Sequence, residues 1–350
     1  MPKQDEQIQR KVEHLFLAEK FYDDNSMADF DSVRLLHNAL PELSMEDIDL
    51  STNFLGFNSS LPIYFNAITG GSKQSERFNG ELAEIAKEFN IPVSSGSMGV
   101  YFRIPDTAPT FRILREKNPA GFVIANISGK YNLEQAKQAV DLVDANALQI
   151  HINTLQELAM PEGDREFYWL DNISKIVNNI GLPVIVKEVG FGMTSNDMER
   201  LINIGVKNID ISGFGGTNFA EIESARNHEF DLTYLDNFAL STVESLLESS
   251  KIAESSVNIL ASGGIKAPLD VIKSLRLGAS AVGISGLALH HLQKYSLEET
   301  KLFFEHFCQE LEILMAAFGA KNILEIKKAP IVFDESLVSY MKQRNINLPS

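Results

Sequence analysis

The chain has 350 residues, with 47 acidic against 31 basic side chains and a formal net charge of -16 at pH 7. This charge disfavours nonspecific binding to nucleic acid or to an anionic membrane, and the single cysteine, Cys308, excludes an intrachain disulfide and a cysteine-based zinc site. The first residues are charged throughout, unlike a signal peptide, and no uninterrupted apolar stretch is long enough to span a bilayer. These features predict a cytoplasmic protein.

Residues 1–60 are predicted to form a helical extension or lid ahead of the main domain. Its apolar positions recur at helical spacing, and they are Ile8, Val12, Leu15 and Phe16. Arg10, Lys11 and His14 group within about one turn of the same helix. From the spacing alone, a solvated polar face is the favoured interpretation of these basic side chains. A basic lid over an anion site is the alternative.

Eight short apolar runs follow, each ending in small or polar residues and followed by an amphipathic stretch. The runs cover residues 62–70, 92–97, 122–128, 147–153, 183–189, 208–213, 258–264 and 281–286. Near-continuous apolar runs are typical of parallel strands that helices bury on both faces. The repeat predicts an α/β fold, a (β/α)8 TIM barrel over residues 61–295, with functional side chains at the carboxyl ends of its strands.

Amphipathic stretches predict helices at 75–89, 133–142 and 267–277, with Pro268 in the first turn of the last one. A long insertion at 215–257 is polar at first and is predicted to become helical from about residue 242. Residues 296–350 are predicted to form a C-terminal helical tail, beginning with a helix at 297–318, that packs on the barrel or at an oligomer interface. Cys308 lies on the apolar face of that helix and is expected to be a buried, unreactive thiol.

Glycines concentrate at the ends of the last three predicted strands. They are Gly213, Gly215, Gly216, Gly263, Gly264 and Gly286. Backbone amides without side chains can approach a phosphate closely, and the loops after strands seven and eight are the usual phosphate position in such barrels. The phosphate could belong to a sugar, a nucleotide or a flavin.

The other strand ends favour a flavin. Thr69, Ser97 and Asn126 close the first three strands with hydrogen-bonding groups, and Lys187 lies in the fifth strand. A buried lysine could stabilise negative charge at one edge of a reduced isoalloxazine, while amide and hydroxyl groups bind its pyrimidine edge. A structural Lys187–Glu188 pair is less favoured, because adjacent strand residues point to opposite faces.

The densest polar cluster, HINTLQE at 151–157, follows the fourth strand. His151 and Asn153 share one face of that strand, and Gln156 and Glu157 follow in the loop or first helical turn. A carboxylate here could hold Mg²⁺ together with phosphate oxygens of a substrate. A helix N-terminal charge is the structural alternative for Glu157, and the polar neighbours at a barrel mouth favour the metal role.

Together these segments resemble the type 2 isopentenyl-diphosphate isomerases, which are FMN-dependent. The resemblance spans almost the whole chain and rests on Arg10-Lys11-x-x-His14, NAITGGS at 66–72, SSGSM at 94–98, ANISG at 125–129, HINTLQE, MPEGDREF at 160–167, PVIVKEVGFGM at 183–193, SGFGGTNF at 212–219, and ASGGI to ALHH at 261–291. HINTLQE combined with the Arg-Lys pair is specific to this family, whereas other flavin barrels share the glycine-rich segments. Phe219 departs from some relatives, which carry Trp there.

The resemblance implies roles for individual residues. The implied FMN-binding residues are Ala67, Ile68, Thr69, Ser97, Asn126, Lys187 and Thr217, with Gly263, Gly264, Gly286 and Leu287 near the phosphate. The implied substrate-binding residues are Arg10, Lys11, His14, Arg103, His151, Asn153 and Gln156. Gln156 is also the implied catalytic residue beside the reacting carbons, and Glu157 is the implied Mg²⁺ ligand.

The implied reaction is the reversible conversion of isopentenyl diphosphate to dimethylallyl diphosphate by proton transfer on reduced FMN, a step of isoprenoid biosynthesis. NADPH would serve only to reduce the flavin. The resemblance also implies a homo-oligomer, either a tetramer or an octamer.

Other functions remain open on the sequence. An FMN-dependent 2-hydroxy-acid oxidoreductase is the main alternative because residues 262–264 and 272–278 resemble that family, although Phe214 stands where its histidine base is expected. A noncatalytic flavin-binding barrel would have no need of the polar cluster at 151–157. A phosphate-sugar lyase could use Lys187 as a Schiff base.

Overall fold

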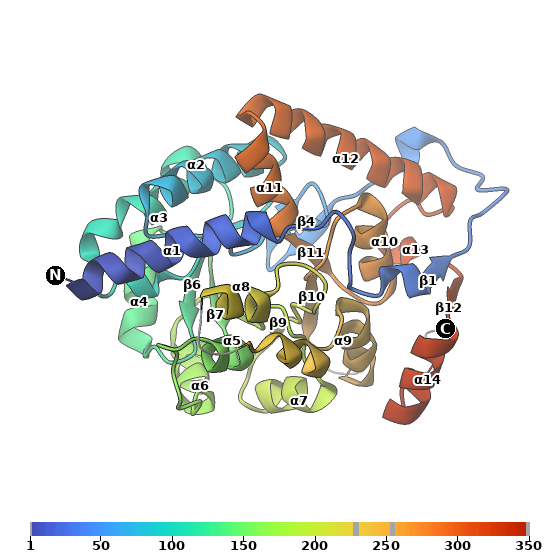
Figure 1. Ribbon diagram of the computed structural model, residues 1–350. Helices are drawn as coiled ribbons and strands as arrows, with labels where there is room; N and C mark the ends of the chain where they lie inside the picture. The colour runs from blue at the N-terminus through green and yellow to red at the C-terminus, as the bar shows by residue number, and fades with distance from the viewer. Residues whose placement is uncertain (1, 227–230, 253–255, 348–350) are drawn as a thin grey trace.

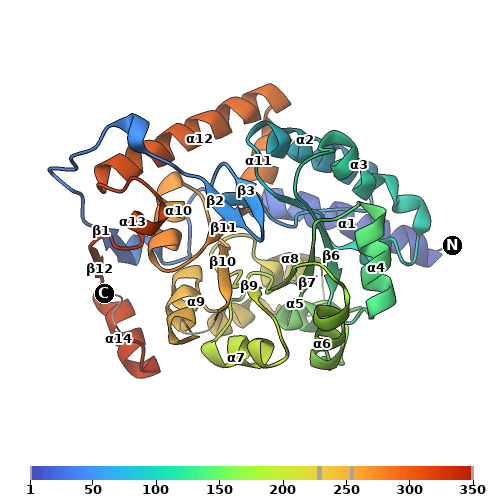
Figure 2. The same ribbon diagram turned by 180° about the vertical axis from the view of Figure 1, so that it is seen from behind.

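The computed structural model describes residues 2–226, 231–252 and 256–347, with side chains described from residue 8 onward. Its centre is a closed barrel of parallel strands in the order β10-β11-β4-β5-β6-β7-β8-β9 (Figures 1 and 2). The barrel strands are β4 (Ile63–Phe65), β5 (Val93–Ser94), β6 (Val123–Ser128), β7 (Ala147–His151), β8 (Val184–Lys187), β9 (Asn208–Asp210), β10 (Asn258–Ser262) and β11 (Ala281–Ile284). The predicted (β/α)8 barrel is therefore confirmed.

Each predicted apolar run contains one barrel strand, but most of the strands end before the run does. The run at 62–70 contributes only Ile63–Phe65 to the sheet, and the run at 258–264 contributes Asn258–Ser262. The remaining residues of each run leave the sheet at its carboxyl end. Those short irregular stretches form the floor and walls of the pocket described below.

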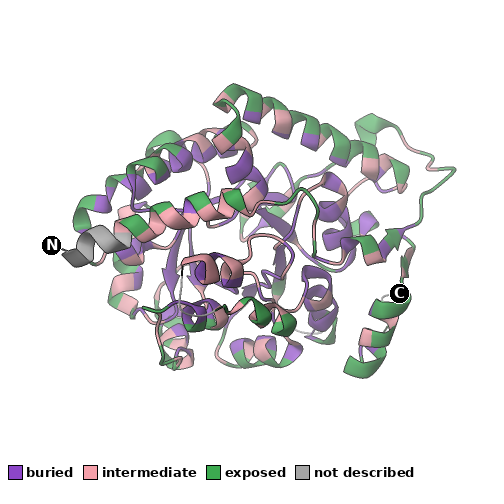
Figure 3. Ribbon diagram, in the orientation of Figure 1, coloured by how far each residue is buried: buried purple, intermediate pink, exposed green. Residues whose placement is uncertain are grey.

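Helices surround the barrel and bury its strands from outside, as the burial colouring in Figure 3 shows. The outer helices are α2 (Lys73–Glu88), α3 (Pro109–Lys117), α4 (Leu133–Leu142), α6 (Leu170–Asn179), α7 (Ser195–Asn203), α9 (Thr242–Ser249), α10 (Pro268–Arg276) and α11 (Gly286–Lys294). The predicted helices at 75–89, 133–142 and 267–277 are confirmed within two residues at each end, and Pro268 is the first residue of α10. The short 3-10 helices are η1 (Phe30–Ser32), η2 (Met45–Asp47), η3 (Met98–Val100), η4 (Pro105–Thr107), η5 (Thr233–Phe238) and η6 (Ser250–Ile252).

Two further helices lie in loops at the carboxyl end of the barrel, α5 (Thr154–Ala159) and α8 (Phe219–Arg226). The insertion at 215–257 becomes helical earlier than predicted, because α8 precedes the expected helix that begins at Thr242. The cause is local: the Asn218 side-chain oxygen accepts the backbone N–H groups of Ala220 and Glu221 at 2.9 and 3.2 Å. An asparagine in this position caps a helix.

The amino-terminal end of the barrel is covered by a hairpin of β2 (Thr52–Phe54) and β3 (Phe57–Ser59), seen in front of the strands in Figure 2. Phe54 is 2% exposed, and its ring lies 5.2 Å from Tyr64 and 5.5 Å from Phe122 between ring centroids. This aromatic layer belongs to a buried apolar cluster that includes Ile124 and Leu260. The floor of the barrel is therefore apolar, whereas its opposite end is polar.

The N-terminal helix α1 (Pro2–Lys20) crosses the carboxyl mouth of the barrel (Figure 1). The prediction that the apolar side chains of this helix share one buried face is wrong in part. Leu15 is buried, but Val12 is 40% and Phe16 66% exposed. The helix instead turns the side that carries Lys11 and His14 toward the barrel. A solvated polar face is therefore the wrong interpretation, and the alternative of a basic lid fits the structure.

The C-terminal segment consists of α12 (Leu297–Ala317), α13 (Ile323–Ile326), β12 (Ile331–Phe333) and α14 (Glu335–Arg344). Phe304 of α12 packs edge-on against Phe65 of the barrel at 5.1 Å, and β12 pairs antiparallel with β1 (Val33–Leu35). Cys308 is only half-buried, and burial raises the pKa of its thiol to about 12. Within the described residues, no helix is both long and apolar enough to cross a membrane. The domain limits at 60 and 295 stay predictions.

Candidate functional site

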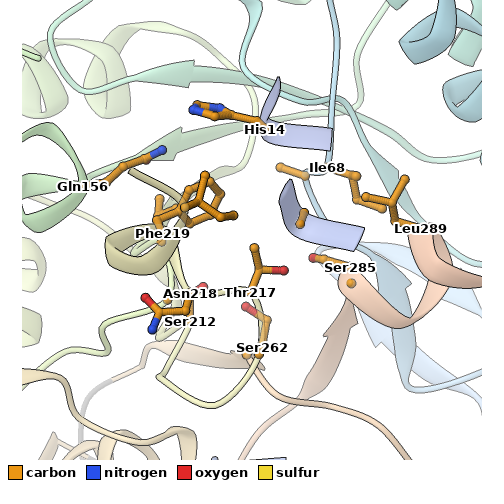
Figure 4. Close-up of a pocket in the computed structure, with 18 of the residues that line it drawn as sticks. His14, Ile68, Gln156, Ser212, Thr217, Asn218, Phe219, Ser262, Ser285 and Leu289 are labelled. Carbon is orange, nitrogen blue, oxygen red and sulfur yellow. The ribbon is translucent and has the colours of Figure 1, made fainter. Parts of the chain in front are cut away.

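A pocket opens at the carboxyl end of the barrel, between the strand ends and α1. Figure 4 shows His14 of α1, Gln156 of α5 and Phe219 of α8 on one side, and Ile68, Ser285 and Leu289 on the other. The predicted residues that line this pocket are Arg10, Lys11, His14, Ala67, Ile68, Thr69, Ser97, Asn126, His151, Asn153, Gln156, Glu157, Lys187, Thr217, Gly263, Gly264, Gly286 and Leu287. Arg103 is exposed and lies outside the lining, so its role stays a prediction.

Lys11 carries a positive charge into the pocket without a partner. No carboxylate or other acceptor among the described residues bonds its ammonium, and burial together with Arg10 lowers its pKa to about 8. The Arg10 Nε is buried and also has no hydrogen-bond partner in the described part of the chain. Buried donors of this kind are costly unless a ligand satisfies them. The helix therefore presents an anion-binding surface.

Helix α8 holds α1 in this position through a group of charges around the fully buried Glu223. Arg226 donates to Glu13 of α1 at 3.1 Å and to Glu162 at 3.0 Å, and it also pairs with the fully buried Glu223. The His14 Nε2 lies 2.8 Å from the other Glu223 oxygen, and burial lowers the pKa of that imidazole while Glu223 opposes the shift. These contacts attach the basic side of α1 to the barrel.

The polar cluster after the fourth strand is connected by its own hydrogen bonds. The Asn153 amide nitrogen donates to the Gln156 oxygen at 2.9 Å and to a Glu157 oxygen at 3.1 Å. The other Glu157 oxygen accepts the Asp164 backbone N–H at 2.7 Å. Because the Gln156 oxygen is held by Asn153, its amide nitrogen remains available to the pocket that Gln156 lines.

Lys187 ends the fifth strand and is buried on the pocket floor. Its ammonium donates to the Ser212 hydroxyl at 3.0 Å and to the Glu188 backbone carbonyl at 2.5 Å. Burial lowers the pKa of Lys187, and the nearby carboxylates of Asp210 and Glu188 oppose that shift. A partly desolvated cation at this point would favour negative charge on a neighbouring group.

Glycines form a side-chain-free wall on the opposite side of the pocket. Gly263 has φ +99°, and a Cβ there would lie 2.0 Å from the Gly213 carbonyl oxygen. Gly264 has φ +69°, and a Cβ there would lie 2.7 Å from the Ala28 Cβ in the segment that follows α1. Only glycine adopts a positive φ without strain and leaves out the Cβ for which there is no room. The nine-residue α11 begins at Gly286 beside this wall, so the free N–H groups of its first turn add to the donors there.

Comparison with known proteins decides the family. The chain is 48% identical over 347 residues to an isopentenyl-diphosphate delta-isomerase of Latilactobacillus sakei, covering 99% of each chain. It is 43% identical to the enzyme of that name from Staphylococcus haemolyticus, covering 97% of each. The model of the FMN-dependent dehydrogenase family matches residues 114–332. The chain belongs to the type 2 isopentenyl-diphosphate delta-isomerases.

Solved structures agree with the isomerase in fold. A mandelate oxidase structure superposes with a TM-score of 0.65 at 15% identity, covering 92% of this chain and 98% of that one. A flavocytochrome b2 structure superposes with a TM-score of 0.68 at 17% identity, covering 96% of this chain and 86% of that one. At this identity the likeness shows the fold alone.

The isomerase also contains polar residues inside the barrel that the sequence did not single out. Asp210 is fully buried and accepts hydrogen bonds from Tyr64, Asn66 and Ser262, each at 2.7 Å. Gln149 is fully buried beside them. A charged residue within an apolar strand run, as in NIDISG at 208–213, was a signal that could have found Asp210.

Among the described residues of the isomerase, no three histidine, cysteine or acidic side chains gather as a metal site. A Mg²⁺ ion needs fewer than three protein ligands, because it keeps several bound waters and also binds phosphate oxygens of a substrate. The Asn153 side-chain oxygen is buried and has no hydrogen-bond partner among the described residues, and its amide nitrogen bonds the 8% exposed Glu157. One carboxylate ligand and one acceptor for a metal-bound water therefore fit such an ion.

Proposed function

We propose that this chain interconverts isopentenyl diphosphate and dimethylallyl diphosphate by proton transfer, with reduced FMN bound in the pocket at the barrel mouth. One observation carries the proposal. Lys11, whose ammonium makes no hydrogen bond or ion pair with a described residue, lines the same pocket as the Gln156–Glu157 cluster and the glycine wall. A site for an anionic substrate and a site for a phosphorylated cofactor thus adjoin each other, with an amide side chain between.

The residues present fit FMN. The side-chain-free wall at Gly263, Gly264 and Gly286 would admit its phosphate, and the buried Lys187 would lie at the ring. The same pocket is lined by Thr69, Ser97, Asn126, Thr217, Ala67, Ile68 and Leu287. When bound and reduced, FMN supplies an electron-rich ring with protonatable nitrogens. The protein contributes the position of that ring and the Lys187 charge beside it.

The diphosphate would bind under α1. Lys11 and the buried Arg10 Nε, which has no hydrogen-bond partner among the described residues, supply donors, and His14 lines the same surface. Because α1 crosses the pocket, the same contacts would also exclude water from the alkene. Anchoring the diphosphate fixes where the hydrocarbon end of the substrate lies relative to the pocket floor.

Gln156 is the residue that we expect beside the reacting carbons. Its oxygen accepts from Asn153, which orients the amide and leaves its nitrogen toward the pocket. From there it would hold or relay a proton at the alkene.

Mg²⁺ would bind at Glu157 together with substrate phosphate oxygens and water. The Glu157 carboxylate already accepts from Asn153 and from the Asp164 N–H, which holds it in place. The orphaned Asn153 oxygen would accept a hydrogen bond from a metal-bound water. We further propose NADPH as a reductant of the flavin, a cytoplasmic location, and a homotetramer or homo-octamer.

Oxidation of a 2-hydroxy acid is the competing function, and the site does not favour it. Phe214 follows the sixth strand where that chemistry needs a histidine base, and its backbone N–H donates to the Leu240 carbonyl at 2.8 Å. The structural likeness to a mandelate oxidase and a flavocytochrome b2 concerns the fold.

An anaerobic assay tests the proposal. The purified protein is incubated with isopentenyl diphosphate, FMN, Mg²⁺ and NADPH, with parallel samples lacking FMN or containing a chelator. We expect formation of dimethylallyl diphosphate that requires reduced flavin, consumes no stoichiometric NADPH and falls when Mg²⁺ is removed. Bound flavin without conversion would reject the isomerase function, and oxidation of lactate or mandelate instead would support the alternative.

A further inference from the structure

A continuous chain of side-chain hydrogen bonds runs across the barrel interior from β9 to β7. It begins at the Asp210 carboxylate, which lies 2.7 Å from the Asn66 amide nitrogen. The Asn66 oxygen lies 3.0 Å from the Gln149 amide nitrogen, and the Gln149 oxygen lies 2.6 Å from the Asn126 amide nitrogen. The Asn126 oxygen lies 2.8 Å from Nδ1 of His151, which lines the pocket.

The direction of every bond in this chain follows from its first member. The Asp210 carboxylate is surrounded by donors, so Asn66 must turn its N–H₂ group toward it. The Asn66 oxygen then faces Gln149, which must donate in turn, and the same requirement passes to Asn126. The last oxygen, that of Asn126, can only accept, so Nδ1 of His151 must carry a proton.

A backbone group supports the orientation of Asn66. The Ala67 backbone N–H, which can only donate, donates to the Asn66 oxygen at 2.8 Å. A reversed Asn66 would place its N–H₂ group against this N–H and leave both groups unsatisfied.

The other nitrogen of His151 then has no proton. Desolvation of the partly buried ring and the charges of Lys187, Lys11 and Lys130 lower its pKa to about 3. The imidazole is therefore neutral near pH 7, and a neutral ring with its proton on Nδ1 has a bare Nε2. No described residue donates to that Nε2.

We propose that Asp210 is a positioning residue that acts through Asn66, Gln149 and Asn126 to keep the His151 proton on Nδ1, so that an unprotonated Nε2 accepts a hydrogen bond in the substrate pocket. The group recognised by His151 is then a donor, such as a protonated nitrogen, a hydroxyl or a water. A phosphate oxygen is an acceptor, so the predicted contact between His151 and the diphosphate would need a bridging water. The tautomer does not depend on the proposed function.

The test is nitrogen NMR of the flavin-loaded protein with ¹⁵N-labelled histidine. The chain has 7 histidines, and the signals of His151 are assigned by their loss in His151→Gln. We expect a protonated-type shift at Nδ1 and a bare-type shift at Nε2 in the parent. In Asp210→Leu, which keeps a similar side-chain shape, the terminal acceptor is lost, and the Nδ1-protonated signature should be lost with it.

Tyr64→Phe is the matched control, because Tyr64 donates to the same Asp210 oxygen but stands outside the chain of amides. It should leave the His151 signature unchanged. If Asp210→Leu does not fold, Gln149→Met cuts the chain at its middle with similar side-chain volume and should remove the signature. Protonation of Nε2 in the parent, or an unchanged signature in whichever severed variant folds, would overturn the proposal. None of these outcomes requires isomerase turnover.

Discussion

A single lysine makes the substrate affinity of this site depend on pH. Burial and Arg10 lower the pKa of Lys11 to about 8, so its charge is present below that pH and is lost as the pH rises through it. We expect the KM for isopentenyl diphosphate to rise between pH 7 and 9 in the parent. Lys11→Met should raise KM by about 10- to 100-fold at pH 7, the cost of one charged hydrogen bond.

The pH profile of Lys11→Met is the control for this prediction. Steady-state kinetics from pH 6 to 9 would show KM nearly constant through pH 8 in the variant, because the titrating group is gone. An equal rise in variant and parent would assign the pH effect to a different group.

Gln156 should matter for turnover more than for cofactor binding. Gln156→Leu removes the amide that faces the pocket and keeps a similar volume, so kcat should fall by about 100-fold or more, the usual scale of a positioned proton-transfer group. The flavin spectrum and the dissociation constant for FMN should stay near those of the parent, since Gln156 lies across the pocket from the glycine wall. Unchanged kcat would remove Gln156 from the reaction.

The side chains of the pocket were predictable from sequence to different degrees. Polar residues that end apolar strand runs, such as Thr69 and Asn126, could be placed at the barrel mouth because parallel strands share one carboxyl end. The interior residues Asp210 and Gln149 could not be connected, because their hydrogen bonds join strands that are distant in sequence. The register that brings them together is a tertiary property.

At the scale of elements, the attachment of α1 to α8 depends on Arg226. Removing this guanidinium in Arg226→Met leaves Glu223 buried without its cation, which should cost about 3–5 kcal/mol of stability. The same change frees Glu13 of α1, so KM for the diphosphate substrate should rise by more than tenfold. Thermal or urea unfolding and steady-state kinetics measure the two effects.

Lys137→Met is the matched control, since Lys137 pairs with Glu134 on an exposed helix surface. Its stability should change by less than about 0.5 kcal/mol and its KM not at all. A KM for Arg226→Met equal to that of the control would mean that α1 stays in place without this cation.

The helix α1 also shows where periodicity misleads. Its apolar spacing correctly predicted a helix, but the assignment of the buried face failed at Val12 and Phe16. Apolar periodicity identifies the core-facing side of a helix that packs on a core. A helix that covers a binding pocket places charged side chains inward instead, and only the position of the pocket reveals this. The early start of α8 was missed because its cap, Asn218, lies in a glycine-rich polar loop.

Across the whole molecule, stability and function are located at opposite ends of the barrel. Phe54→Ala would remove the central ring of the apolar floor, which should lower the free energy of unfolding by about 3–5 kcal/mol. Because the floor is at the amino-terminal end, kcat and KM measured below the melting transition should remain within about twofold of the parent. A large change in KM would show that the two ends are coupled.

The pairing of β1 with β12 has a consequence for how the protein is made. The ribosome must have synthesised residues 331–333 before β1 has its partner, although residues 33–35 emerged long before. Contacts so distant in sequence form late, since closing a long loop carries an entropic cost. The nascent chain can therefore close its barrel strands, which end at Ile284, before the segment next to α1 is secured. We expect a chain truncated before β12 to keep most of the flavin affinity of the full-length chain and to lose more of its affinity for the diphosphate substrate.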